Sequence, residues 1–556
     1  AQTLLRIYPE RLLRISIMSH ATSHSDTFVI DNLPPIEQLP QRDFSVVPEL
    51  NYPERLNCAI ELLDRALDIA GDIAGADRVL FYATDRNWTY GEMLSRVNRI
   101  AHVLTAELGL EPGNRVLLRG PNTPEMAAVW FAVVKAGGIC VTTMPLLRRV
   151  ELEYVINKAK ISHALCDSRW TEEFVDAASN AGLERWMEFN GDSANGLDRR
   201  CEAQPDAFDG IDTHAEDPVL IGFTSGTTGT AKATIHTHRD VMAICDCFPR
   251  YVLKPGADDI FTGTPPFGFT FGLGALLLFP IRFGASIALV EKPGLSELLS
   301  TVERHRATIC FTSPTAYRAS LGELDKYDIS SLEKCVSAGE TLPLPTFESW
   351  RERTGIKIID GIGATELLHI FISSSEDEIR PGATGKVVPG YQAKVVDESG
   401  NEVAPGTIGL LAVRGPTGCR YLSDKRQAKY VQNGWNLTGD AYYMDEDGYF
   451  WFHARADDMI ISGGYNISGI EVERVLLGHA AVQECAVVGV PDQERGMLVK
   501  AFVILKDNSQ AGEQMVKQLQ DYVKSEIAPY KYPRAVDFVA SLPRTETGKL
   551  QRFKLR

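Results

Sequence analysis

The sequence lacks the features that mark several special classes of protein. None of its apolar runs is long enough to cross a membrane as a helix, so we expect no membrane partner. Its ten cysteines are scattered over 556 residues, too sparse for a disulfide scaffold, which predicts a cytoplasmic location. A basic excess is also missing, because the net charge of −16 argues against a nucleic-acid-binding protein. Nothing in the composition indicates an oligomeric state.

Three common ligand-binding signatures are incomplete. Loop 224–232 is not a Walker P-loop, because Ala231 stands where that motif requires its second glycine. Run 361–366 is not a dinucleotide fingerprint, because Glu366 stands at the last glycine position. Two histidines and two cysteines follow the loop without the spacing of a zinc finger: His236, His238, Cys245 and Cys247. Core and helix-surface roles are favoured over zinc for this group.

The order of predicted elements indicates an α/β fold. Strand 115–118, a helix from Pro124 to Lys135 and strand 139–143 have the rhythm of βαβ units on a parallel sheet. From residue 393 turn signals separate β-rich runs, and after residue 457 a compact α+β unit begins. We therefore expect an arm at 1–48, a large domain at 49–456 and a small domain at 457–556. Residues 1–17 are basic and amphipathic like a transit peptide, but an upstream extension before Met18 is favoured.

Loop 224–232 is rich in residue types that bind phosphate. It follows an apolar run from Val219 to Phe223 that predicts a buried strand. Its glycines allow the backbone to approach a ligand closely, and its hydroxyls and Lys232 suit anionic oxygens. A polyphosphate fits this composition, whereas a Ser/Thr/Gly-rich surface linker is the plainer alternative. Four further motifs downstream favour the phosphate interpretation.

These four motifs occur at residues 361–366, 438–440, 455–458 and 544–549. Together with loop 224–232 they resemble the adenylate-forming superfamily of acyl-CoA synthetases, nonribosomal adenylation domains and luciferase-type oxygenases. The resemblance extends from about residue 50 to the end. It implies a large N-terminal domain of layered, parallel-rich sheets and helices, followed by a small mobile C-terminal domain. It also implies ATP, Mg²⁺ and coenzyme A as ligands, beside a small carboxylic acid.

The resemblance assigns a role to each motif residue. As catalytic residues, Lys549 would reach both the substrate carboxylate and the phosphate, Thr365 would contact the α-phosphate, and Glu366 would hold Mg²⁺. Asp457 would be the hinge of the small domain, and Gly463 and Gly464 would line the coenzyme A tunnel. The residues implied in ATP binding are Thr224, Ser225, Gly226, Thr227, Thr228, Gly229, Lys232, Gly339, Glu340, Asp360, Gly361, Ile362, Asp440 and Arg455. Of these, Gly339, Glu340 and residues 360–362 would surround adenine, and Asp440 would bind the ribose hydroxyls.

Details at 271–274, 360–366 and 368–371 look like those of benzoate- and 2-aminobenzoate-CoA ligases. Ile362 replaces the aromatic residue that commonly stacks on adenine, as in benzoate-type ligases. The expected substrate pocket comprises Phe267, Phe269, Phe271, Gly363, Ala364 and His369. The phenylalanines equally suit a plain core, and His369, expected one helical turn past Glu366, either meets an ortho substituent or packs behind that glutamate.

We therefore expect an ATP-dependent aryl-CoA ligase that activates a benzoate-type acid as its acyl-AMP and transfers it to the thiol of coenzyme A. A medium-chain acyl-CoA synthetase and a free-standing carrier-loading adenylation enzyme share the same motifs. A luciferase-type oxygenase shares the first step. A non-catalytic binding protein is disfavoured, because Lys549, Glu366 and Asp440 are all present.

Overall fold

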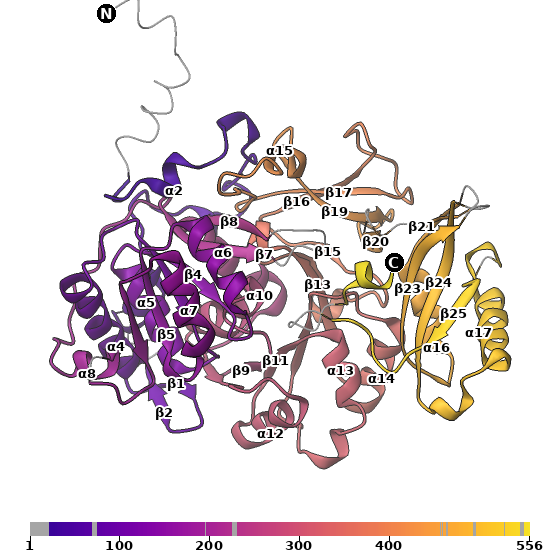
Figure 1. Cartoon of the computed structure of the whole chain (residues 1–556), viewed down its shortest axis with the longest axis horizontal. Helices are drawn as coiled ribbons and strands as arrows, with labels where there is room; N and C mark the ends of the chain where they lie inside the picture. Colours follow the sequence, from indigo (N-terminus) through magenta and orange to yellow (C-terminus); the bar gives the residue numbers. More distant parts are fainter. Residues whose placement is uncertain are drawn as a thin grey trace, which may run out of the picture.

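A computed structural model of the chain describes residues 22–68, 75–194, 196–224, 231–455, 458, 460–462, 465–492, 496–527, 529–544 and 550–556. The described chain has a larger N-terminal part and a smaller part, drawn in yellow in Figure 1, that begins after β20 (Phe450–Arg455). In these ranges no helix combines the length and the apolar character needed to span a bilayer. The expected α/β class is confirmed.

A six-stranded sheet forms the first layer, in the order β6-β5-β3-β4-β7-β8, and only β8 runs antiparallel to its neighbour. Its strands are β3 (Arg115–Arg119), β4 (Ile139–Thr143), β5 (His163–Asp167), β6 (Trp186–Phe189), β7 (Pro218–Thr224) and β8 (Lys232–Thr237). The helices between them are α5 (Pro124–Lys135), α6 (Arg149–Ala159), α7 (Thr171–Ala181) and α8 (Leu197–Glu202), and α9 (His238–Asp246) follows β8. Every residue of β3, β4 and β5 is buried, as expected for strands covered on both faces.

A nine-stranded sheet forms the second layer, in the order β15-β14-β13-β12-β11-β9-β10-β1-β2. Its strands are β1 (Val79–Tyr82), β2 (Asn87–Thr89), β9 (Ile260–Gly263), β10 (Ser286–Ala288), β11 (Ile309–Thr312), β12 (Lys334–Ser337), β13 (Ile358–Gly363), β14 (Ile370–Ser373) and β15 (Lys386–Val387). Associated helices are α3 (Arg65–Asp68), α4 (Tyr90–His102), α10 (Thr270–Leu273), α11 (Phe279–Arg282), α12 (Leu295–His305), α13 (Pro314–Ser320) and α14 (Leu344–Thr354). The strands from β13 to β1 are parallel, so their carboxyl ends share one edge.

Local signals fix the helix starts. Thr89 caps α4 in a capping box with Glu92, which satisfies two backbone N–H groups that have no partner inside the helix. Thr123 caps α5, and Pro124 occupies the first helical position, where a missing N–H costs nothing. The start at Pro124 was predicted from the sequence.

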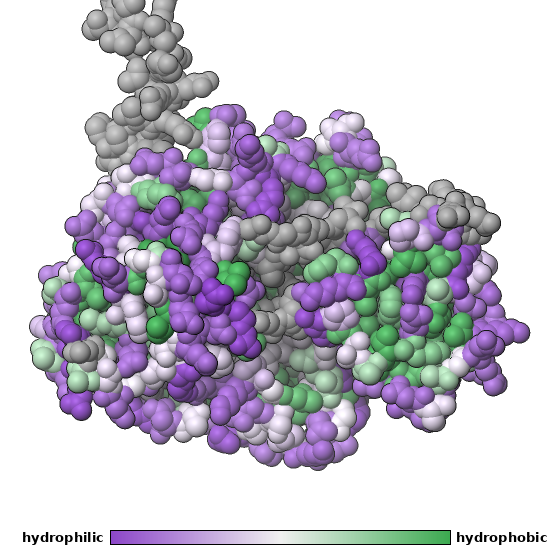
Figure 2. Space-filling view, viewed as in Figure 1, coloured by the Kyte–Doolittle hydropathy of each residue, from purple (hydrophilic) through white to green (hydrophobic). Residues whose placement is uncertain are grey.

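Two smaller sheets complete the chain. Strands β16 (Gln392–Val396), β17 (Gly409–Arg414), β18 (Val431–Gln432), β19 (Trp435–Met444) and β20 form an antiparallel layer, with α15 (Gln427–Tyr430) beside it. The smaller part contains β21 (Ile460–Ser462), β22 (Tyr465–Ile467), β23 (Val482–Asp492), β24 (Gly496–Leu505) and β25 (Ala535–Phe538), with α16 (Gly469–Gly478) and α17 (Glu513–Glu526). On the face shown in Figure 2, hydrophobic residues gather over this smaller part, whereas the larger part is mainly hydrophilic.

The described part of the N-terminal arm, residues 22–48, lies along the larger part and includes the short helix α2 (Phe28–Asp31) and a 3₁₀ turn (Ile36–Gln38). Its residue Arg42 donates to the buried carboxylate of Asp240 on α9, at 3.2 Å. Arg420 approaches the same carboxylate at 3.0 Å. Burial opposes ionisation of Asp240, but Arg420, His236 and Arg42 outweigh it and hold the pKa of Asp240 well below its usual range.

We expect Asp240→Asn to lower the free energy of unfolding by about 3 kcal/mol, because it leaves the buried Arg420 guanidinium without its counter-ion and leaves Arg42 with Glu216 alone. A depressed folded-state pKa means that this stabilisation is present above the ordinary carboxyl value and is lost only at much lower pH. The decrease in the free energy of unfolding caused by Asp240→Asn should therefore be as large at pH 5 as at pH 7, measured by thermal or urea unfolding. Asp192→Asn, at an exposed position, is the control. A change no larger than that of the control would contradict the assignment.

Candidate active site

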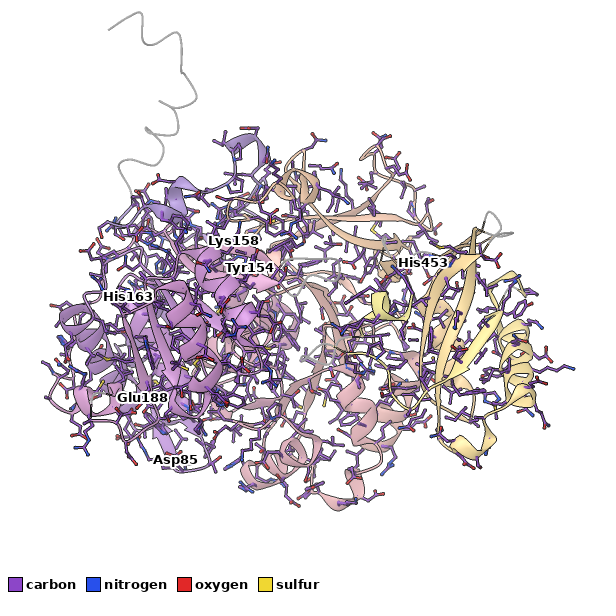
Figure 3. The ribbon with its side chains drawn as sticks, viewed as in Figure 1. Asp85, Tyr154, Lys158, His163, Glu188 and His453 are labelled. Atoms are coloured by element: carbon purple, nitrogen blue, oxygen red, sulfur yellow. The ribbon has the colours of Figure 1, made fainter. Side chains whose placement is uncertain are left out.

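Loop 225–230 connects two paired strand ends. Thr224, the last residue of β7, pairs with Lys232, the first residue of β8, and its Oγ1 accepts from the Lys232 backbone N–H at 3.4 Å. On α6, Tyr154 donates from its hydroxyl to the Ala231 carbonyl at 2.8 Å, and Lys158 donates to the Ser423 carbonyl at 3.1 Å (Figure 3). One helix therefore holds both the end of the loop and the segment that follows Tyr421.

Glu366 is the centre of the described charge cluster. It is only 6 % exposed, in a short 3₁₀ turn that follows β13. Its Oε1 accepts from the Lys232 ammonium at 3.0 Å and from the Tyr421 hydroxyl. Lys232 also donates to the Tyr421 hydroxyl oxygen at 2.7 Å, so the three polar groups contact one another. Among the described residues, Oε2 of Glu366 has no hydrogen-bond partner.

His236 supports the turn that carries Glu366. It is fully buried on β8, and its Nε2 donates to the Thr365 carbonyl at 2.7 Å. This contact joins the strand that begins with Lys232 to the backbone beside the carboxylate. His238 on α9 instead accepts from the Cys58 backbone N–H at 3.1 Å. Burial lowers its pKa to about 3, so this imidazole is neutral.

The residues expected around adenine lie at the carboxyl ends of parallel strands. Ser337 and Asp360 pair in register on β12 and β13, and the Ser337 hydroxyl donates to Asp360 at 2.9 Å. Gly339 adopts φ +88°, a conformation that favours glycine. Gly361 and Ile362 belong to β13 itself, which continues past Asp360 to Gly363. The carboxyl edge of a parallel sheet is where ligands bind in such folds.

Glu340 links the two parts of the chain. Its Oε2 accepts from the Thr315 hydroxyl at 2.6 Å, and its Oε1 lies 3.4 Å from the Arg544 guanidinium. Arg544 also pairs with Glu484 of β23 at 2.9 Å, and Glu484 pairs with Arg318 of α13 at 2.9 Å. This chain of ion pairs places the end of segment 529–544 beside the adenine-side residues.

Asp440, expected to bind ribose, lies on β19 opposite Arg455 of β20 and is largely buried. Its backbone N–H donates to the Thr438 hydroxyl at 3.2 Å. Both positions belong to the antiparallel layer. Several expected residues lie outside the described chain: Ser225, Gly226, Thr227, Thr228, Gly229, Asp457, Gly463, Gly464 and Lys549. The side chain of Arg455 is likewise not described.

His369 is buried in an aromatic cluster. Its ring centroid lies 4.5 Å from that of Phe279, 5.6 Å from Phe271 and 5.9 Å from Phe248. Its Nε2 donates to the Phe271 carbonyl at 3.3 Å, and its Nδ1 has no partner among the described residues. Burial lowers its pKa to about 3, so the imidazole is neutral.

The expectation that a helical turn separates His369 from Glu366 was wrong. The 3₁₀ turn ends at Leu367, and Leu368 has φ +71°, so the chain reverses before His369. A side chain on Gly363 would approach the His369 carbonyl to 2.8 Å, which explains the glycine there. Glu366 and His369 thus have different partners, Lys232 and Phe271 respectively.

The three expected pocket phenylalanines separate into two groups. Phe267 is buried in the main core, where its backbone N–H donates to Asn122 at 2.8 Å. Phe269 and Phe271 are partly exposed, and Phe271 contacts both Phe311 and His369. Ala364 is also partly exposed, and Gly363 is exposed. Phe267 is therefore a core residue, whereas the pocket role of Phe269 and Phe271 stays a prediction.

The donor set at Glu366 fits Mg²⁺. In proteins this ion is commonly held by one or two carboxylates together with phosphate oxygens of a substrate. Glu366 supplies one carboxylate with a free oxygen, and no group of three His, Cys, Asp or Glu residues that could hold a metal occurs among the described residues. The protein contribution is a single hard ligand, which suits a metal delivered with a polyphosphate.

Comparison with known proteins places the chain in a family. The AMP-binding enzyme family matches residues 73–421, and the AMP-binding enzyme C-terminal domain matches residues 471–549. The benzoate–CoA ligase of Thauera aromatica is 34% identical over 517 residues, covering 92% of this chain and 97% of its own. The mitochondrial acyl-coenzyme A synthetase ACSM3 of Homo sapiens is 32% identical, covering 91% of this chain and 90% of its own. The crystal structure of an anthranilate CoA ligase with anthranoyl-AMP matches with a TM-score of 0.86 and 35% identity, covering 92% of this chain and 98% of that one.

The chain therefore belongs to the AMP-binding enzyme family, as its motifs predicted. Within that family it is an AMP-forming acid–CoA ligase, an enzyme class that uses ATP, Mg²⁺ and coenzyme A with a carboxylic acid.

Sequence reasoning missed four side chains that shape this site. They are His236, Arg420, Tyr421 and Gln427. The first was expected to be a core or helix-surface residue rather than a zinc ligand, and the other three lie in a segment without any recognised motif. An arginine, a tyrosine and a glutamine at 420–427 carry no local signal, because their partners come from β8, α9 and the arm.

We expect Asp360→Asn to raise the thermal stability at pH 8 more than at pH 5. Burial raises the pKa of Asp360 from its ordinary 3.8 to about 7, against a smaller opposing effect of the Ser337 hydrogen bond. The folded state thus disfavours the ionised carboxyl, and the penalty grows between those two values by about 1.4 kcal/mol per pH unit. Asparagine keeps the acceptor for Ser337 without the charge. An equal change of Tm at both pH values would contradict this.

Proposed function

We propose that the protein is an aryl-CoA ligase whose substrate is a benzoate-type acid, with 2-aminobenzoate and benzoate favoured. A carboxylate oxygen of the acid attacks the α-phosphorus of ATP, and pyrophosphate leaves. The thiol sulfur of coenzyme A then attacks the carbonyl carbon of the acyl-AMP, its proton is lost to solvent, and AMP leaves. The pair of Lys232 and Glu366 in the Tyr421 cluster is the observation that carries the first step.

The first step brings two anions together, so positive charge must compensate in the transition state. Among the described residues, Lys232 donates one ammonium hydrogen to Glu366 and one to Tyr421, which leaves its third hydrogen for a phosphate oxygen. Bound Mg²⁺ would supply further charge neutralisation of the phosphates, held by the free Oε2 of Glu366. Loop 224–232 would surround the β- and γ-phosphates, and Asp440 would accept from the ribose hydroxyls.

We assign Lys549 to the first step only. Arg544 pairs with Leu550 in an isolated bridge, and the Arg544 guanidinium contacts Glu340. Both flanks of the loop that bears Lys549 are therefore held beside the adenine-side residues, which supports a role in adenylation. Rotation about Asp457, at the proposed domain boundary after residue 456, would then remove the loop and open the tunnel lined by Gly463 and Gly464 for the thiol.

An aromatic acid is supported by the surroundings of His369. Flat rings of Phe271 and Phe279 and the small Gly363 and Ala364 favour a single ring over a long alkyl chain. The neutral His369 has an unpaired Nδ1, which suits a hydrogen bond from an ortho amino group. The named substrates of two relatives, benzoate and anthranilate (2-aminobenzoate), agree with this choice.

We expect benzoate and 2-aminobenzoate to have a higher kcat/KM than decanoate, measured as pyrophosphate release with and without coenzyme A. Phe269→Ala should reduce the ratio of kcat/KM for the benzoates to kcat/KM for decanoate, because it enlarges the pocket. Higher kcat/KM for decanoate would instead favour the medium-chain function, which the human relative represents. Thioester formed only on a carrier protein, and not on coenzyme A, would contradict the ligase assignment.

We expect Lys549→Ala to reduce acid-dependent pyrophosphate release about 100-fold or more, because transition-state charge is left uncompensated. Thioester formation from supplied acyl-AMP and coenzyme A should stay within a few-fold of the wild-type rate. Lys554→Ala, at an exposed position five residues further on, is the matched control and should leave both steps unchanged. Equal losses in both steps would overturn the assignment of Lys549.

A further inference from the structure

Tyr421 occupies an unusual position for a buried tyrosine. It is 0 % exposed, yet its hydroxyl contacts the two charged side chains of the site. It donates to Oε1 of Glu366 and accepts from Lys232 at 2.7 Å. The Lys232 ammonium also lies 4.8 Å from the centroid of the Tyr421 ring, within range of a cation–π interaction. One side chain thus holds the lysine through both its ring and its hydroxyl.

The backbone of Tyr421 is held on two sides. Tyr421 forms an isolated antiparallel bridge with Thr234 of β8, and the adjacent Ile235 and Leu422 backbone N–H groups donate across the same edge, to Arg420 and Ala233. The strand that begins with Lys232 therefore also fixes Tyr421. On the other side, the Tyr421 backbone N–H donates to the Gln427 side chain at 2.9 Å.

Gln427 connects this support to the N-terminal arm. It is 1 % exposed, and its Nε2 donates to the Gln38 carbonyl at 2.8 Å and to the Cys419 carbonyl at 3.0 Å. Its amide is thus fully engaged with backbone groups of two segments, the arm and residues 419–421. Such a buried, satisfied amide is a rigid support rather than an adaptable one.

The hydroxyl of Tyr421 decides which oxygen of Glu366 remains available. Both donors, Lys232 and Tyr421, meet at Oε1, and Oε2 has no partner among the described residues. The Tyr421 hydroxyl is the donor in this contact, because an ionised carboxylate oxygen can only accept. Without this donor the carboxylate is free to rotate and pair with Lys232 through either oxygen.

We propose that Tyr421 is a positioning residue of the adenylation step: its hydroxyl fixes Glu366 with Oε2 directed to the metal that accompanies ATP. The proposal rests on the proposed function, since it assigns Glu366 and Lys232 to metal and phosphate. Loss of an outer partner of a metal ligand commonly weakens metal affinity about 10- to 100-fold.

The test is the binding of ATP by calorimetry, in Mg²⁺ and in EDTA. For Tyr421→Phe we expect about tenfold weaker binding of MgATP, with metal-free ATP within about twofold of the wild type. The matched control is Tyr430→Phe, which removes a hydroxyl from the neighbouring ring, 5.7 Å from that of Tyr421. Unchanged MgATP binding by Tyr421→Phe, or an equal loss with and without Mg²⁺, would overturn the proposal.

A double-mutant cycle separates positioning from general packing. In a Glu366→Gln background, Tyr421→Phe should not weaken MgATP binding further, because the carboxylate that it orients is gone. Additive losses would contradict the proposal. Should Tyr421→Phe fold poorly, Gln427→Met removes the acceptor behind Tyr421, and we expect a smaller loss that is again confined to MgATP.

Kinetics distinguish this proposal from the function on which it depends. In pyrophosphate release, Tyr421→Phe should lower kcat and raise the KM for MgATP, with the KM for the acid unchanged. If the wild type adenylates no carboxylic acid, the proposed function fails. If the wild type adenylates and Tyr421→Phe behaves like it, only the role of Tyr421 fails.

Discussion

The buried carboxylate of Asp240 joins three segments that lie far apart in the sequence. Arg42 comes from the arm, Arg420 precedes Tyr421, and Asp240 belongs to the helix that follows β8. An isolated carboxylate could not remain ionised at this depth, so the fold requires both guanidinium groups. Because Arg420 is held there, the next residue pairs with the edge of β8, and Tyr421 meets Lys232. The geometry of the active site therefore depends on a second charge cluster, formed by Asp240, Arg42 and Arg420.

The same logic of compensated charge explains the site itself. Glu366 and Lys232 largely neutralise each other. Among the described residues, each still has one atom without a hydrogen-bond partner: an oxygen on the glutamate and an ammonium hydrogen on the lysine. Groups fixed in advance stabilise a transition state without the cost of reorganising, whereas mobile side chains in water would have to rearrange. A polyphosphate with its cation matches this pair of open positions.

Local chemistry made much of the fold predictable, and tertiary contacts explain the failures. Thr89 and Thr123 signalled their helix starts through side-chain caps, and the apolar run before Thr224 indicated its strand. No prediction from the sequence covers the segment at 171–215, which contains α7, β6 and α8, because β6 is a short strand and α8 a short polar helix. Glu366 was found through its motif. Tyr421 was not, since its importance arises only when β8 and segment 420–422 pair.

The contact between the two parts suits a joint that opens in each catalytic cycle. Arg318, Glu484, Arg544 and Glu340 form successive ion pairs, with every side chain between 18% and 28% exposed. Partly exposed pairs of this kind contribute about 0–1 kcal/mol each, far less than the buried pair of Arg420 and Asp240, whose side chains are 7% and 0% exposed. Weak, hydrated pairs thus join the smaller part to the larger one. If the C-terminal part rotates between the two half-reactions, these pairs can break at little cost, and both partners of Glu366, Lys232 and Tyr421, stay with it in the larger part.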